Sequence, residues 1–142
     1  MITIRKDSLV AVLPENHPLS NASAISINDL RRERFISPGK QSAHRFLTMD
    51  LCKKHGFEPC IVLETTQLNS VMDYIRQGVG IYLMMKQVAK DHMIPGDRIV
   101  PLAEHVSIAI VIARLKSSQQ PEKIQLLWNF IDDYFTLNRS HA

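Results

Sequence analysis

The stretch "SLVAVLPENHPLS", residues 8–20, is the most informative segment of this 142-residue chain. Residues 8–13 form a short apolar run rich in valine and leucine that Pro14 stops, which is typical of a strand buried on both faces. A corner bracketed by prolines follows and contains His17. No residue at the spacing of a metal ligand or a catalytic triad accompanies His17. We therefore interpret the segment as a strand end and a structural corner.

Strand and helix patterns alternate along the rest of the chain. Short apolar runs predict strands at 34–36, 60–64, 79–84, 98–102 and 106–115. Apolar residues spaced by three and four predict one helix from Ser42 to a left-handed cap at Gly56, and another capped by Thr66 or Asn69 and closed by Gly78. The first would bury Ala43, Phe46, Leu47 and Leu51, and the second Leu68, Val71, Met72 and Ile75. A short helix starts at Met85. This alternation indicates an α/β fold with a largely parallel sheet flanked by helices.

The last predicted helix, 121–136, has the most apolar face in the chain. It begins at Pro121, which is favourable at a first helical position. Its apolar residues recur at helical spacing: Ile124, Leu127, Trp128, Ile131, Tyr134 and Phe135. The segment "LKSSQQPE", residues 115–122, is the one stretch that resembles a junction. A helix of this kind must bury its apolar face against something.

Composition and charge exclude several classes of protein. No apolar run approaches the ~20 residues of a membrane-spanning helix, and the N-terminus carries no signal-peptide core. We therefore expect a cytoplasmic protein that does not contact a membrane. The net charge of +3 is mild, and Glu33 interrupts the densest basic cluster, "LRRER" at 30–34. We expect that cluster to be a solvated face that does not contact DNA.

The sequence predicts no catalytic, cofactor or metal site. Cys52, His55 and Cys60 have partly suitable spacing for zinc, but a fourth ligand is missing nearby. The simpler interpretation is a surface histidine near a helix end, with cysteines that fill apolar space. There is no Gly-x-Ser-x-Gly elbow. The segment 78–80, Gly-Val-Gly, is half a dinucleotide motif and ends a helix instead of opening one.

Two polar stretches are better candidates for a binding site. Residues 37–42, "SPGKQS", and residues 64–67, "ETTQ", each leave the end of a predicted strand and enter a helix. Helix N-termini have free N–H donors and the positive end of the helix dipole, so they suit small anions. This is also the edge at which α/β sheets bind ligands. Simple helix capping explains the same residues, and the sequence leaves both readings open.

The order of these segments resembles the effector-binding domain of a LysR-type transcriptional regulator. The residues that carry the resemblance are a His-Pro-Leu-Ser corner at 17–20, an Asn-Asp-Leu element at 28–30 and "GVGIYLMM" at 78–85. The resemblance extends from about residue 5 to residue 136. Met85 stands where the family commonly has proline.

The resemblance implies a lobe of the type 2 periplasmic-binding-protein-like fold followed by a C-terminal amphipathic helix. Residues 1–114 would form lobe two, and residues 115–142 the return segment and helix of lobe one. The family's helix-turn-helix domain and the first half of lobe one have no counterpart here, so we expect a fragment. The implied ligand is a small effector, an anion or carboxylate, bound in a cleft between lobes. The expected effector-binding residues are Ser37, Pro38, Gly39, Ser42, Thr65 and Thr66.

The resemblance also sets the expected partners. DNA would be contacted only through a helix-turn-helix domain that this sequence does not contain, and the isolated chain should bind effector weakly or not at all. The apolar helix 121–136 should pack on lobe two or on a second copy, and we expect a homodimer. Three alternatives stay open: a solute-binding-protein lobe, a small enzyme, and a fragment that acts by interaction alone.

Overall fold

The computed structural model describes residues 1–115 and 121–138. Most of the junction expected at 115–122 lies outside these residues. The chain divides into two compact units, Asp7–Ile108 and a smaller one formed by Met1–Lys6 with the segment that starts at Ala109. No helix among the described residues is long and apolar enough to cross a membrane.

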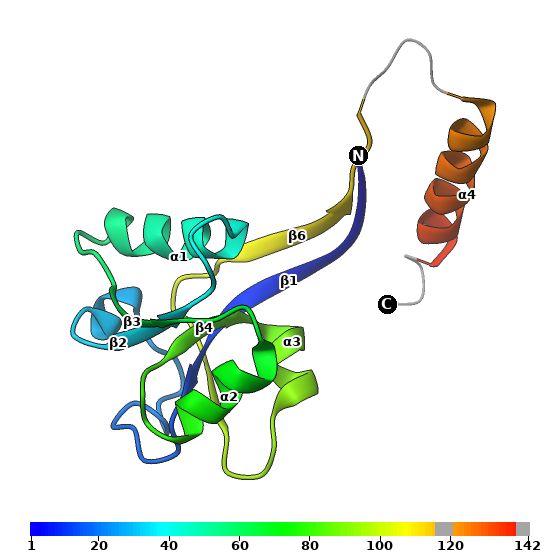
Figure 1. Ribbon diagram of the computed structural model, residues 1–142. Helices are drawn as coiled ribbons and strands as arrows, with labels where there is room; N and C mark the ends of the chain where they lie inside the picture. Colours follow the sequence, from blue (N-terminus) through cyan, green and yellow to red (C-terminus); the bar gives the residue numbers. More distant parts are fainter. Residues whose placement is uncertain (116–120, 139–142) are drawn as a thin grey trace. The chain divides into compact units, whose positions relative to one another are not determined.

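The predicted elements are present in the predicted order (Figure 1). The strands are β1 (Ile2–Leu13), β2 (Arg34–Ser37), β3 (Cys60–Glu64), β4 (Tyr82–Met85), β5 (Arg98–Pro101) and β6 (Ser107–Ile112). The helices are a 3₁₀ turn (Ile27–Leu30), α1 (Ala43–Lys54), α2 (Leu68–Arg76), α3 (Lys86–His92) and α4 (Glu122–Asn138). The fold is therefore α/β, as expected.

Strand β1 is the centre of the larger unit. It lies between β4 and β5 and is antiparallel to both, so that Val12 stands opposite Tyr82 on one side and Ile99 on the other. Strand β6 also pairs with β1. Strands β2 and β3 form a parallel ladder, and a parallel bridge between Phe35 and Ile81 links β2 to the residue before β4.

The strand directions refine the expectation of a largely parallel sheet. Strands β2, β3, β4 and β5 run in one direction, because β2 is parallel to its neighbours and β1 is antiparallel to both β4 and β5. Strand β1 alone among these five runs the other way. The sequence could not predict this reversal, because an apolar run buried on both faces looks the same in either direction.

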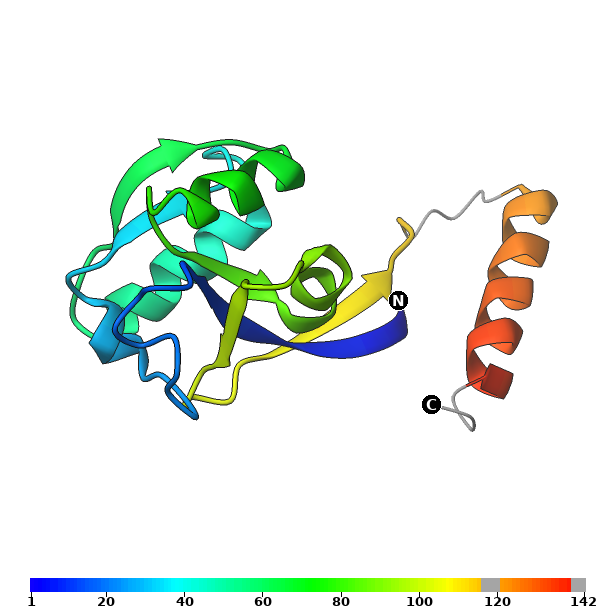
Figure 2. The ribbon, with the colours of Figure 1, turned by 90° about the horizontal axis from the view of Figure 1, so that it is seen from below.

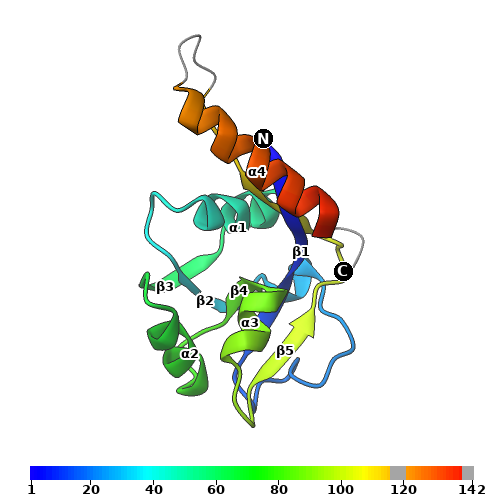
Figure 3. The same cartoon turned by 90° about the vertical axis from the view of Figure 1, so that its right-hand side faces the viewer.

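Alternation along β1 divides the core into two clusters, one on each face of the sheet. Leu9, Ala11 and Leu13 pack with Leu51 and Cys52 of α1. Their neighbours Val10 and Val12 pack against α2 and α3. Helix α1 therefore covers one face, and helices α2 and α3 cover the other. Figures 2 and 3 show the same layers from below and from the side. This confirms that residues 8–13 are buried on both faces.

The buried face of α1 differs from the predicted one. Ala43 is exposed and Phe46 is 65% exposed. The buried residues of α1 are Thr48, Leu51 and Cys52. The prediction was wrong for Ala43 and Phe46, whereas Leu51 is buried as predicted and Leu47 is partly buried. It counted apolar residues only, but this helix turns polar His44 and Thr48 inward and bonds them to backbone carbonyls.

Helix α2 buries Val71, Met72 and Ile75 as expected, but neither predicted residue caps it. Its N-cap is Gln67, which makes no side-chain capping bond. The hydroxyl oxygen of Thr65 instead accepts a hydrogen bond from the Gln67 N–H. The expected left-handed turns after α1 and α2 are present, with φ of 76° at Gly56 and 74° at Gly78. Only glycine adopts this conformation without strain.

Helix α4 belongs to the smaller unit and has a largely exposed apolar surface. The Arg114 guanidinium lies 4.5 Å from the centre of the Trp128 ring and also donates to the side chain of Gln125. The exposed apolar residues of the helix are Ile124, Leu126, Leu127, Phe130, Tyr134 and Leu137. Of the face predicted for this helix, Trp128, Ile131 and Phe135 are partly buried, and the other three residues are exposed.

Candidate functional site

The ends of β2 and β3 lie side by side, as the candidate site requires. The N–H of Thr65 donates to the carbonyl oxygen of Ser37 at 3.1 Å, which extends the parallel ladder beyond the last residue of β3. The Ser37 side chain is buried and donates its hydroxyl proton to the carbonyl oxygen of Pro38. The two polar stretches singled out in the sequence therefore meet at one edge of the sheet.

A shallow hollow of about 410 Å³ opens at this edge, between the β2–α1 turn and the start of α2. It is lined by Gly39, Lys40, Gln41, Ser42 and Thr66. We refer to it as the β2–α1 hollow. The structure thus brings together three of the six expected residues. Ser37, Pro38 and Thr65 lie in the adjoining backbone and do not line the hollow.

The hydroxyl oxygens of Ser42 and Thr65 both accept backbone hydrogen bonds at the helix starts, and Ser42 is the N-cap of α1. The Ser42 oxygen accepts a hydrogen bond from the His44 N–H at 3.2 Å, and the Thr65 oxygen accepts from Gln67 at the same distance. A hydroxyl that accepts such a bond still has its own proton to donate. Capping and anion binding are therefore compatible at Ser42, and the geometry does not force a choice between them.

Two cations stand near the hollow, and they differ in their availability. Arg45 donates to Glu64 at 2.5 Å and makes longer contacts with Ser37 and Pro38. Its charge is balanced by that carboxylate. Lys40 lines the hollow and is exposed. Sequence reasoning missed the Arg45–Glu64 pair, because no local pattern joins a helix residue to the end of a strand beyond it.

His44 and Tyr82 form a second arrangement that the sequence did not reveal. Their rings stack with centres 5.4 Å apart, and His44 Nε2 lies 2.6 Å from the carbonyl oxygen of Leu83. A carbonyl oxygen only accepts, so this ring nitrogen donates. Burial raises the pKa of Tyr82 to about 12. The pair fixes the first turn of α1 against β4 and so holds the β2–α1 turn in place.

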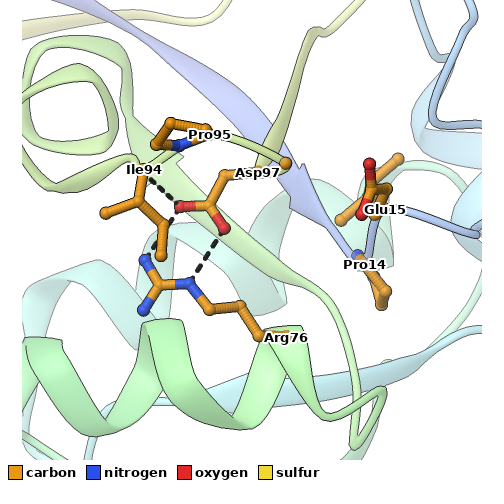
Figure 4. Close-up of a pocket in the computed structure, with 8 residues that line it drawn as sticks. Pro14, Glu15, Arg76, Ile94, Pro95 and Asp97 are labelled. Atoms are coloured by element: carbon orange, nitrogen blue, oxygen red, sulfur yellow. Dashed lines mark hydrogen bonds and ion pairs between the residues drawn. The ribbon is translucent and has the colours of Figure 1, made fainter.

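A smaller hollow of about 110 Å³ lies between the end of β1 and the loop before β5 (Figure 4). The guanidinium of Arg76 donates two hydrogen bonds to Asp97, at 2.9 and 2.8 Å, and the Ile94 N–H donates a third. Mainly through the bonds from Arg76, and despite partial burial, the pKa of Asp97 is held below its usual value of 3.8. The hydrogen bonds of the Asp97 carboxylate are all made within the protein. We therefore interpret the Arg76–Asp97 pair as a structural link between α2 and the loop before β5.

The residues considered for a metal site differ in their burial and in their hydrogen-bond partners. Cys52 is buried, which raises its pKa to about 11, and Cys60 is exposed. His55 donates to the Leu51 carbonyl and lies 3.4 Å from Glu104. The described residues contain no group of three or more histidine, cysteine, aspartate or glutamate side chains that could hold a metal ion.

Glu104, which follows β5 in the chain, holds the 3₁₀ turn through hydrogen bonds. Its carboxylate accepts from the Ser26 hydroxyl at 2.8 Å and from the Ile27 N–H at 3.0 Å. Burial pushes the pKa of Glu104 upward, but these hydrogen bonds and the nearby His55 outweigh it, and the net direction is downward. The 3₁₀ turn that contains the Asn-Asp-Leu element is thus held at its N-terminal end.

His17 has a structural partner that the sequence did not show. Its Nδ1 accepts a hydrogen bond from the Leu19 N–H at 3.1 Å, and its Nε2 lies 3.1 Å from a carboxylate oxygen of Glu33. The proton therefore sits on Nε2. The ring joins the corner at 17–20 to the segment before β2, which agrees with the structural interpretation of this corner.

Residues 2–136 match the family model of the LysR substrate binding domain. The chain belongs to this LysR family. The resemblance seen in the sequence is thus confirmed, and so is the fold that it implied. The relatives of this LysR domain include "HTH-type transcriptional regulator TtuA" of Agrobacterium vitis, which is 30% identical over 132 residues. "HTH-type transcriptional regulator AlsR" of Bacillus subtilis is 34% identical over 91 residues. These proteins are regulators and not enzymes.

The LysR domain covers only part of these relatives. The aligned residues make up 88% of this chain and 43% of TtuA, and 62% of this chain and 30% of AlsR. The regulatory domain of CcmR from Synechocystis PCC6803, solved in complex with 2-PG, superposes with a TM-score of 0.74 at 21% identity. The superposed region makes up 94% of this chain and 65% of the CcmR chain. At this identity the likeness establishes the fold.

Proposed function

We propose that this chain is the effector-sensing part of a LysR-type transcriptional regulator and that the β2–α1 hollow binds a small anionic metabolite. One observation carries the proposal: the turn before α1 and the turn before α2 converge on one hollow, with the N-terminus of α1 and the exposed Lys40 at its edge. Free N–H groups, a helix dipole and an ammonium group all favour a negative charge.

The nature of the effector follows from the lining groups. Ser42 and Thr66 offer hydroxyl protons, and Lys40 offers a charge without a fixed planar geometry. Such a set suits a carboxylate or an inorganic anion. Effectors in solved relatives of the same fold are consistent with this class, since the CcmR domain was solved with 2-PG and the QuiR domain with shikimate.

We further propose that the β2–α1 hollow is one wall of a cleft between two lobes. Residues 1–114 would belong to lobe two and residues 115–142 to the return segment of lobe one. The opposite wall would lie in the part of the domain that this chain does not span. Effector binding would then bias lobe closure and subunit arrangement, and DNA would be contacted through a helix-turn-helix domain.

An NMR titration of the whole chain tests the proposal. Acetate, oxalate and inorganic phosphate are added to ¹⁵N-labelled protein, and the backbone amides of 39–43 and 65–67 should shift. Because the proposed opposite wall would lie outside this chain, saturation should require millimolar anion. Lys40→Gln and Ser42→Ala should each weaken the response, whereas Lys54→Gln, on an exposed lysine paired with Asp50, should not. If the anions do not shift these amides, the proposal that the β2–α1 hollow binds them is wrong. Micromolar affinity would contradict the proposal that the opposite wall of the site lies outside this chain.

A homodimer is the second part of the proposal, and α4 supports it. Six large apolar side chains of α4 are more than two-fifths exposed, from Ile124 at 44% to Leu137 at 74%. Exposed apolar patches on this scale are typical of interaction surfaces. Association through α4 would bury them, and size-exclusion chromatography with light scattering measures it directly.

A further inference from the structure

A second hollow, separate from the β2–α1 hollow, lies between helix α3 and strand β5. Figure 3 shows where these two elements lie in the fold. Its volume is about 390 Å³, and we refer to it as the α3–β5 groove. Its lining includes Val10, Lys86, Lys90, Met93, Arg98 and Ile99. It shares no lining residue with the β2–α1 hollow. The two hollows are therefore independent places on the same unit.

The floor and one wall of the α3–β5 groove are apolar. Val10 is almost fully buried beneath it, and Ile99 is partly buried beside it. Met93, at the end of α3, is 43% exposed. Strand β5 pairs with β1 on one side, and Ile99 of β5 packs against the same core cluster as Ala89 of α3. The groove is the apolar strip that lies between α3 and β5.

The rim of the α3–β5 groove is cationic, and two of its charges are not balanced. The side chains of Lys86 and Lys90 make no hydrogen bond or ion pair with any residue that the structure describes. They lie four residues apart on α3 and therefore on the same side of the helix. Arg98 makes only long contacts, at 3.4 Å to the Asp97 carbonyl and 3.5 Å to Glu15.

The one carboxylate in the lining does not cancel this charge. The side chain of Asp97 is only 6% exposed and already accepts two hydrogen bonds from Arg76 and one from the Ile94 N–H, as Figure 4 shows. Arg76 itself lines the smaller hollow on the other side of this pair. The Arg76–Asp97 pair is thus neutral as a unit, and Arg98 pairs with Glu15. The groove retains the positive charge of Lys86 and Lys90.

We infer that the α3–β5 groove is an accessory binding site for a small organic carboxylate with an apolar body. Its volume lies in the range of small-molecule pockets, roughly 300–1,000 Å³. The apolar strip would take the body of the ligand, and the lysines would take its carboxylate at the rim. A ligand here would fasten α3 to β5, at a distance in sequence from the effector site proposed at the β2–α1 turn.

An NMR titration of the whole chain with phenylacetate tests this site, and the neutral isostere phenylacetamide is the matched probe. Phenylacetate should shift the amides of 86–93 and 98–100, and added salt should weaken it because the lysines are exposed. The double variant Lys86→Gln/Lys90→Gln should weaken binding about fivefold, since each exposed charge contact is worth a few tenths of a kcal/mol or more. Lys40→Gln should leave the binding unchanged and thereby separates this site from the β2–α1 hollow.

The inference fails under three results. Phenylacetamide that shifts the same amides equally would show an apolar surface without charge recognition. A double variant with unchanged affinity and an intact spectrum would remove the lysines from the site. Shifts confined to 39–42 and Thr66, and lost in Lys40→Gln, would place the carboxylate in the β2–α1 hollow. A further variant, Met93→Glu, puts a negative charge on the apolar wall and should abolish phenylacetate binding.

Discussion

Gly80 lies so close to Arg34 that a Cβ atom on the glycine would stand 2.6 Å from the Arg34 carbonyl oxygen. Strand pairing brings the two residues this close. The Ile81 N–H donates to that carbonyl at 2.8 Å, and the Ile36 N–H donates to the Ile81 carbonyl at the same distance. These two bonds are the bridge between β2 and the strand β4 segment. The second glycine of Gly-Val-Gly is thus required by strand pairing and not by a nucleotide.

Substitution of Gly80 by alanine should therefore destabilise the fold. The added methyl group meets backbone, which cannot move aside as a flexible side chain does, so we expect a loss of roughly 1–3 kcal/mol in the free energy of unfolding. Chemical denaturation followed by circular dichroism measures it. Gly39→Ala is the control, because a Cβ atom there meets nothing within 4 Å. Equal stability of the two variants would contradict the close approach.

Much of the fold was predictable because local patterns record burial. The apolar run at 8–13 and the spacing of Val71, Met72 and Ile75 both gave the right element and the right buried side. Strand β1 nevertheless begins at Ile2, well before the predicted start. The charged residues Arg5 and Lys6 hid its first half, since they are exposed and break the apolar pattern.

The candidate site was only partly predictable, because the contacts that shape it join distant parts of the chain. Capping by Ser42 followed from local sequence and is confirmed. The stacking of His44 on Tyr82 depends on how α1 lies against β4. The Arg45–Glu64 pair depends on the parallel ladder of β2 and β3. Neither leaves a periodic signal, so a single sequence cannot show them.

The corner histidine gives a second prediction. His17→Ala removes an acceptor for the Leu19 N–H and a partner of Glu33, and it should cost about 1–2 kcal/mol of stability. Where the variant is folded, added anions should still shift the backbone amides of residues 39–43. His105→Ala is the control, since His105 is an exposed loop residue, and it should change stability by less than about 0.5 kcal/mol. A His17 variant as stable as the control would show that the corner does not depend on the ring.

The Arg76–Asp97 pair predicts a dependence of stability on pH. The pKa of Asp97 is lowered below 3.8 in the folded chain, so the carboxylate favours folding at higher pH. That contribution is complete above the unfolded pKa near 3.8 and is lost as the pH falls through the folded pKa. Asp97→Asn should reduce stability at pH 7 and flatten its decline below about pH 4.

Thermal unfolding between pH 2 and pH 7 measures this effect. Asp50→Asn is the matched control, because the Asp50 side chain is 53% exposed and forms an ion pair with Lys54 one helical turn away. Such exposed pairs contribute about 0.3–0.5 kcal/mol. If the stability of the Asp97 variant falls at low pH as steeply as that of the original chain, Arg76 does not hold this carboxylate in its charged form.

The exposed apolar surface of α4 predicts self-association. Leu127 is 57% exposed on the same face as Trp128, and a dimer that covers it should show light-scattering mass twice that of the chain. Leu127→Glu should weaken association at least about tenfold, because burial of a leucine is worth ~1.5–3 kcal/mol and a symmetric interface counts it twice. Thr136→Glu, on the polar side of α4, is the control and should leave the mass unchanged. Trp128 fluorescence should shift to shorter wavelength as the protein concentration rises. A monomer at high concentration, with Trp128 emission typical of water, would refute association through α4.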